Sequence, residues 1–368
     1  MTRANRLFPS VASLPGATIL FALLACSPPA QEAQPREQPK NSADKIEAYL
    51  DEHHVPGASV AVMHQGQLVW SKGFGLADLE HRVAVSSATK FRVGSISKTL
   101  TSVAVALLWE QDKLDLDAPV QRYVSSFPDK RYPITTRQLA GHLSGLPHYN
   151  EEDFINEIHY ESVTDALRKF RHRDLQFEPG ERFSYSSFGW NLISAVVEGA
   201  SGAEFLSYMQ EMVFAPLKMH DTAADHYAQI IEHRTEFYRV SEEGDVFNAT
   251  AIDNSDVWAG GGFLSTAEDL VRFADGVMKE KLLRPETVKL LITPMTTTDG
   301  ESTGYGLGWR VWEIAGRRAV GHSGGHVGAT AELIVLPEES FALAILTNSG
   351  NAGLRELAEE LVSSHLDL

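Results

Sequence analysis

Strand-like segments lie at both ends of this chain, and helical segments lie between them. Residues 57–75 contain two β-rich runs around His64-Gln65-Gly66, which is typical of a hairpin. Residues 306–325 and 329–350 read as further antiparallel strands, and an amphipathic helix follows over 352–365. This order predicts an α/β (α+β) fold, with an antiparallel sheet flanked by terminal helices and an inserted, mostly helical lobe.

The predicted boundaries follow from the same pattern. We expect one folded domain over 44–365, with a sheet lobe at about 44–94 and 300–368. The helical lobe is expected at about 100–299, and the cleft between the two lobes is the default place for a binding site.

The first residues read as a targeting segment. Arg3 and Arg6 precede a short apolar run that ends in Leu23-Leu24-Ala25-Cys26, which resembles the lipobox of bacterial lipoproteins. The prediction is a signal peptide over 1–25, lipidation at Cys26 and a Pro- and Gln-rich tether over 26–43. The protein would then lie in a bacterial cell envelope, facing the periplasm, and at the outer membrane because Ser27 follows the cysteine. An ordinary cleaved signal is the alternative.

Charge and side-chain types exclude several kinds of partner. The formal net charge of −17 disfavours nucleic acid and anionic membrane surfaces, so membrane contact is expected only through a lipid anchor. The single cysteine excludes an intrachain disulfide. His53, His54, His142 and His148 belong to no recognisable ligand motif, so neither a metal nor another cofactor is expected.

Two serines compete for the role of nucleophile. The run from Gly321 to Gly325 fits the G-x-S-x-G elbow around Ser323. An elbow of that kind joins a strand to a helix, whereas this run lies between two strand-like segments close to the chain's end. The interpretation favoured here is that these glycines let another backbone approach closely.

The other serine begins a helix. Ser95-Ile96-Ser97-Lys98 is an S-x-x-K pattern at the start of an apolar helical stripe, so Ser95 and Lys98 lie one turn apart on one face. The helix dipole favours a developing alkoxide at Ser95, and a desolvated Lys98 can accept a proton. The pattern occurs often by chance and needs support from elsewhere in the chain.

Two later motifs supply that support, Tyr185-Ser186-Ser187 and His322-Ser323-Gly324. With S-x-x-K they make the chain resemble the class C-like branch of the serine β-lactamase and penicillin-binding protein superfamily over about 43–365. Within it, residues 94–124 and 135–149 look most like the mitochondrial LACTB-like serine peptidases. The resemblance implies a Ser95 acyl-enzyme, with Lys98 and Tyr185 sharing the serine's proton. It also implies that the N–H groups of Ser95 and Gly325 form the oxyanion hole.

The resemblance implies substrate contacts as well, at His322, Ser187, Ser323 and Gly324, and two of these depart from the family pattern. His322 stands where members that bind β-lactams usually have lysine, and Ser187 stands where asparagine is frequent. Both changes favour a peptide, amide or ester substrate over a β-lactam. The alternatives are a class C-like β-lactamase, a D,D-peptidase acting on peptidoglycan, or a non-catalytic envelope scaffold or sensor. A homo-oligomer or filament is expected by analogy only.

Overall fold

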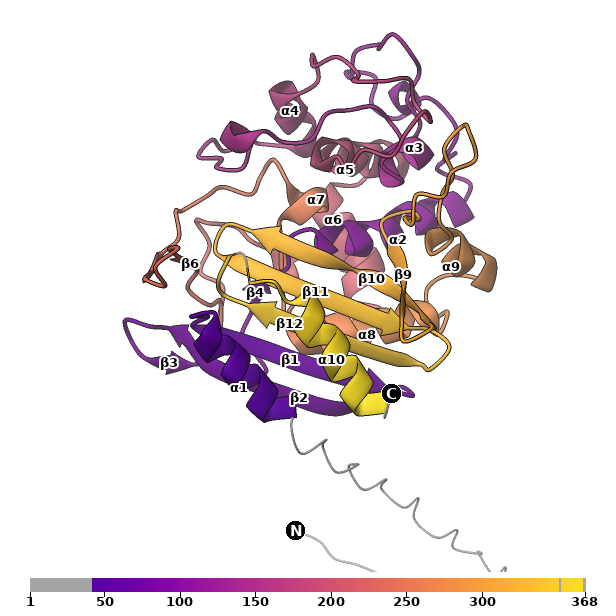
Figure 1. Cartoon of the computed structure of the whole chain (residues 1–368). Coiled ribbons are helices and arrows are strands. Elements are labelled where there is room, and N and C mark those ends of the chain that lie inside the picture. The colour runs from indigo at the N-terminus through magenta and orange to yellow at the C-terminus, as the bar shows by residue number, and fades with distance from the viewer. Residues whose placement is uncertain (1–41, 351, 367–368) are drawn as a thin grey trace, which may run out of the picture. The chain divides into compact units, whose positions relative to one another are not determined.

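The computed structural model describes residues 42–350 and 352–366, and it has one large antiparallel sheet at its centre. The strand order is β3-β2-β1-β12-β11-β10-β9 (Figure 1). The strands are β1 (Gly57–His64), β2 (Gln67–Asp78), β3 (Val83–Ala84), β9 (Arg310–Ile314), β10 (Arg317–His326), β11 (Ala329–Leu336) and β12 (Phe341–Thr347). Because β1 pairs with β12, from Ala58 opposite Thr347 to His64 opposite Phe341, the two ends of the chain meet inside this sheet as expected.

The first hairpin forms where its turn residues predict it. Gln65 and Gly66 both have positive φ, 54° and 79°, as a two-residue turn between antiparallel strands requires. All of β1 is buried except its last residue, and β2 alternates, with Trp70 and Phe74 on the buried side. This difference fits a sheet that is covered on both faces. An inner strand such as β1 is then buried on both sides, whereas β2, nearer the edge, stays partly exposed.

Helices cover both faces of the sheet. On one face lie α1 (Ser42–Glu52) and α10 (Arg355–Leu366), the two ends of the described chain, seen in front of the strands in Figure 1. On the other face, α2 (Ile96–Glu110) contacts β10 and β11, and α8 (Ala267–Met278) contacts β1 and β12. α8 therefore belongs with the sheet, although the sequence pattern placed residues 100–299 in a separate helical lobe. Its buried Leu270, Phe273 and Val277 form the apolar face that packs there.

In the rest of the inserted region, α5 (Ser187–Ser201) has 15 residues, and the other α-helices are short and are joined by long irregular segments. These shorter helices are α3 (Thr136–Ala140), α4 (Val163–Ala166), α6 (Phe205–Met209), α7 (Trp258–Gly261) and α9 (Pro285–Leu291). Two small sheets also form here. One joins β5 (Ala223–Ala224) and β8 (Phe263–Ser265) of this region to β4 (Phe91–Arg92), which precedes it, and the other pairs β6 (Tyr238–Val240) with β7 (Val246–Asn248). Strands of two or three residues carry too little alternation to be predicted from sequence.

The targeting predictions fall outside the described part of the chain. Cys26 and the proposed leader and tether precede Ser42, apart from the tether's last two residues, Ser42 and Ala43, which form the first turn of α1. Within the described ranges, none of the helices combines the length and the apolar character needed to cross a bilayer.

Candidate active site

Ser95 and Lys98 meet at the start of α2, which lies against β10. Ser95 is the residue before the first helical residue, has helical φ and ψ of −64° and −7°, and makes no side-chain capping bond. Its hydroxyl is therefore left for Lys98, whose Nζ lies 2.9 Å from Ser95 Oγ. Nζ also donates to the carbonyl oxygen of Gly260 at 2.6 Å. The turn of helix between the two residues brings the amine onto the serine as the spacing predicts.

The surroundings of Lys98 favour its neutral form. The side chain is fully buried, and none of the described carboxylates forms an ion pair with it. Burial, followed by the positive charge of Arg310, holds the pKa of Lys98 well below its usual value. A neutral amine that still donates to Gly260 keeps a lone pair for the proton of Ser95, so Lys98 has the chemistry of a general base.

Tyr185 completes this group from the loop before α5. The Lys98 amine nitrogen lies 5.0 Å from the centre of its ring, and the Tyr185 hydroxyl is close enough to the Ser95 side chain for that side chain to influence its pKa. Burial raises the pKa of Tyr185 to about 12, although the Ser95 side chain and the charge of Arg310 act in the opposite direction. At neutral pH the phenol therefore keeps its proton, which suits a proton donor better than a resting base.

Two histidines hold the loop that carries Tyr185. The Ser186 N–H donates to His142 Nδ1 at 3.0 Å, and the Ser187 N–H donates to His148 Nδ1 at 3.2 Å. The His142 ring also packs on Tyr185, with 4.2 Å between ring centres. The sequence marks both histidines in a run typical of the family, but no spacing rule connects them to a loop some 40 residues later.

The third motif places the buried His322 on β10, with 6.1 Å between the centres of its ring and the Tyr185 ring. Its Nδ1 lies 2.6 Å from the carbonyl oxygen of Ser323, so Nδ1 carries the proton, and Nε2 accepts from the Tyr305 hydroxyl at 2.8 Å. Burial is the main cause that holds the pKa of His322 well below its usual value, and the positive charge of Arg310 acts in the same direction. His322 is only 1% exposed and both ring nitrogens are engaged, so it presents no cation to a substrate.

The glycines around Ser323 bring two backbones together. A Cβ on Gly324 would lie 2.0 Å from the Val93 carbonyl oxygen, and one on Gly94 would lie 2.8 Å from the Gly325 nitrogen. This is the close approach expected from the sequence, and it sets Gly325 beside the start of α2. Ser323 itself pairs in register with Glu332, so its side chain shares the sheet face on which Glu332 pairs with Arg355 of α10.

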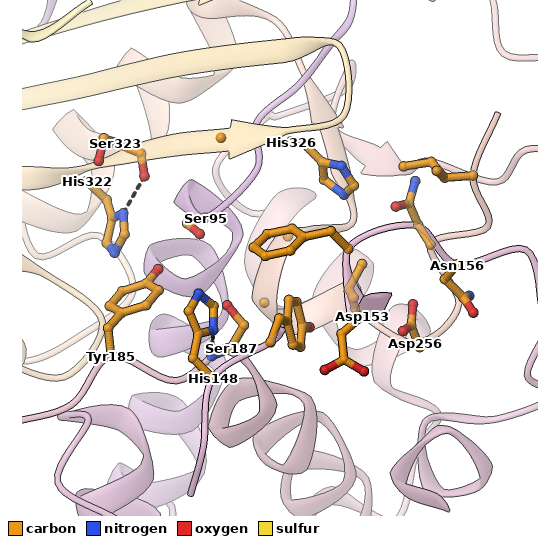
Figure 2. A pocket seen from close by; sticks show the side chains of 18 of the residues that line it. Ser95, His148, Asp153, Asn156, Tyr185, Ser187, Asp256, His322, Ser323 and His326 are labelled. Atoms are coloured by element: carbon orange, nitrogen blue, oxygen red, sulfur yellow. Dashed lines mark hydrogen bonds between the residues drawn. The ribbon is translucent and has the colours of Figure 1, made fainter. Parts of the chain in front are cut away.

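The three motifs border one cavity of about 270 Å³, shown in Figure 2. The predicted residues that line it are Ser95, Tyr185, Ser187, His322, Ser323 and Gly325, whereas Lys98 and Gly324 lie behind its surface. Residues that the sequence analysis did not assign to a site also line it: His148, Tyr149, Asp153, Phe154, Asn156, Ile252, Asp253, Asn254, Asp256, Val257, Gly260, Gly261, Arg310 and His326.

Arg310 is the cation that this cavity offers in place of His322. It lies on β9, is exposed, and its guanidinium carbon lies 5.9 Å from the centre of the Tyr185 ring. It forms no ion pair with any carboxylate in the described chain. The sequence gives no sign of this role, because an arginine on an edge strand is ordinarily a solvated surface residue.

No group of three or more histidine, cysteine, aspartate or glutamate side chains in the described ranges is arranged to hold an ion. His142 and His148, which the sequence left as ligand candidates of low value, serve the loop of Tyr185 instead.

Comparison with known proteins agrees with this geometry. The Beta-lactamase family model matches residues 43–366. The human (Homo sapiens) mitochondrial serine beta-lactamase-like protein LACTB is 34% identical, over 82% of this chain and 72% of its own length. The D-amino acid amidase of Ochrobactrum anthropi SV3 has the same fold, with a TM-score of 0.76 at 22% identity, over 89% of this chain and 99% of the amidase.

A second solved structure is similar to the same extent. The octameric penicillin-binding protein homologue from Pyrococcus abyssi has a TM-score of 0.78 at 24% identity, over 89% of this chain and 77% of its own. The family model covers the described domain almost completely, and the three motifs converge on one cavity. The chain belongs to the beta-lactamase family of serine hydrolase-type proteins.

Proposed function

We propose that this protein is a serine hydrolase that acts on peptide, amide or ester bonds through an acyl-enzyme on Ser95. The observation that carries the proposal is the 2.9 Å contact between Ser95 Oγ and the Nζ of a fully buried Lys98. A lysine buried without a carboxylate partner costs stability, and its position in contact with a serine hydroxyl is typical of a catalytic base.

The reaction follows from the positions of these groups. Neutral Lys98 takes the proton of Ser95 while Oγ attacks the substrate carbonyl carbon, and the N–H groups of Ser95 and Gly325 stabilise the resulting oxyanion. Tyr185 then gives its proton to the leaving nitrogen or oxygen as that bond breaks. Water attacks the ester, its proton passes to Tyr185, and the proton on Lys98 returns to Ser95 Oγ.

For the substrate, we favour a peptide or amide of the kind expected for a LACTB-like peptidase. The neutral, buried His322 supports this preference, since it offers no charge to the carboxylate of a β-lactam. The alternative, a class C-like β-lactamase or D,D-peptidase, is favoured by a different observation. The unpaired Arg310 at the cavity gives a carboxylate-bearing substrate an ion-pair partner.

Turnover of matched reporters tests these choices. We expect the protein to hydrolyse aryl esters or peptide anilides, and Ser95→Ala to lose that activity while remaining folded. Slow or absent turnover of a cephalosporin reporter supports the peptidase assignment, and rapid turnover supports the β-lactamase. A folded protein inert toward all reporters, with no adduct after exposure to penicillin, favours the third alternative, an envelope scaffold or sensor.

Location and assembly remain proposals as well. Attachment to the cell envelope through Cys26 rests on the leader sequence alone, and mass analysis of the membrane-extracted protein would reveal the lipid. A homo-oligomer is proposed by analogy only, and light scattering of the purified protein would test it.

A further inference from the structure

His148 presents a fixed hydrogen-bond donor to the cavity that the reaction described above does not use. Its Nδ1 accepts the Ser187 N–H at 3.2 Å, so the proton of the neutral ring lies on Nε2. Nε2 has no hydrogen-bond partner among the described residues, and the side chain is only half-buried where it lines the cavity. Figure 2 shows the ring between Tyr185 and Ser187, with one edge toward Ser95.

The ring cannot turn easily to present its other nitrogen. It stacks on Tyr149 with 5.2 Å between ring centres and 22° between planes, and it meets Tyr185 edge-on at 5.4 Å. Phe154 approaches edge-on at 6.0 Å. Burial lowers the pKa of His148 to about 4, so the ring stays neutral over the physiological range. A neutral ring whose Nδ1 is engaged can donate from Nε2 but cannot accept a proton there.

The position of this donor indicates which part of a substrate it faces. Tyr185 and Arg310 mark the leaving-group side, because Tyr185 protonates the departing atom. His148, Tyr149 and Phe154 line the cavity together and contact one another, and we assign this aromatic group to the acyl part of the substrate. A half-buried donor without a partner is best matched there by a carbonyl oxygen.

We propose that the Nε2–H of His148 binds an amide carbonyl on the acyl side of the substrate, which makes N-acylated, peptide-like acyl groups the preferred class. This inference rests on the proposed function, since it assumes that Ser95 is acylated. His148 would then determine specificity through its Nε2–H. If it only accepted the Ser187 N–H, its role would be limited to supporting the Tyr185 loop.

The test compares two aryl esters of nearly equal shape. N-(phenylacetyl)glycine p-nitrophenyl ester carries an acyl-side amide, and 5-phenylpentanoic acid p-nitrophenyl ester replaces that amide with two methylene groups. His148→Phe keeps the ring packing but loses the Nδ1 acceptor of the Ser187 N–H, so kcat/KM should fall on both esters. We expect it to fall at least about tenfold further on the amide ester than on the other. His148→Gln can both donate and accept, and should recover most of the preference.

The outcomes separate this inference from the proposed function. Equal losses on both esters in His148→Phe, or no loss on either, would show a purely structural role and overturn the inference alone. Hydrolysis that persists in Ser95→Ala, or a parent protein that cleaves neither ester, would overturn the proposed function and the inference with it. Activity of His148→Phe on the pentanoate ester also reports that this variant is folded.

Discussion

At the scale of single residues, the proposed reaction requires Lys98 to be neutral, so that it can accept the proton of Ser95. Arginine is similar in length and charge but does not deprotonate in proteins, so Lys98→Arg should remove the base while keeping a cation. We expect kcat/KM to fall by about 100-fold or more on any ester that the parent hydrolyses. Lys72→Arg, at an exposed position of β2, is the matched control and should leave kcat/KM unchanged. A Lys98→Arg variant with more than about a tenth of parental activity would contradict the assignment.

Buried Lys98 should also leave a signature in stability. The pKa of Lys98 is lowered in the folded protein, whereas it is near 10.4 in the unfolded chain. Between these two pKa values, Lys98 carries a proton in the unfolded chain but not in the folded one. In that window parental stability should increase with pH, relative to Lys98→Met, by up to ~1.4 kcal/mol per pH unit. Urea unfolding of both proteins at pH 7 and pH 9 measures the difference. Parallel pH dependences would mean that Lys98 is charged in the folded protein.

At the scale of elements, the site depends on how closely β10 approaches the start of α2. A methyl group on Gly324 would lie 2.0 Å from the Val93 carbonyl oxygen, whereas one on Gly325 meets nothing within 4 Å. Gly324→Ala should therefore push the strand from the helix, at a cost of about 1–3 kcal/mol. Gly325 does not have a positive φ, so alanine fits its backbone, and Gly325→Ala should unfold at nearly the parental temperature. Thermal unfolding of the two variants measures this difference. Equal melting temperatures would contradict a tight contact between Gly324 and the Val93 backbone.

Elements with a strong local signal are the ones that sequence predicts well. The hairpin at Gln65-Gly66 follows from turn chemistry. Thr135 caps α3, as its place before an apolar run suggests: its hydroxyl accepts the Gln138 N–H, and its own N–H donates to the Gln138 side chain. The partner of α8 was not predictable, because an amphipathic stripe indicates that a face is buried but not which surface buries it.

At the scale of the whole molecule, the sheet joins segments more than 250 residues apart, and α10 closes its outer face. Leu361 of α10 is fully buried in the cluster beneath α1 and α10, on the side of the sheet opposite α2 and Ser95. Leu361→Ala should cost about 2–5 kcal/mol of stability without changing kcat of the folded enzyme. Glu360→Ala, on the exposed side of the same helix, should cost about 0.5 kcal/mol or less. A large loss of kcat with little loss of stability would show coupling through the sheet.

The candidate site was predictable in its motifs but not in its supporting residues. Ser95 and Lys98 are joined by helical spacing, which a sequence displays directly. Arg310, His148 and Gly260 reach the same cavity from three distant segments, and only the folded chain brings them together. For His322, the sequence shows that a histidine stands where lysine is usual. It does not show that the ring is neutral and buried, because that state depends on Tyr305 and the strand backbone.

The intact mass of the protein after reaction with a fluorophosphonate shows whether Ser95 is the nucleophile. This reagent forms a bond from phosphorus to an activated serine oxygen and releases fluoride, so each modified serine adds one defined mass. We expect one adduct on the parent and on Ser323→Ala, and none on folded Ser95→Ala. An adduct that persists in Ser95→Ala, or one lost only in Ser323→Ala, would contradict Ser95 as the nucleophile.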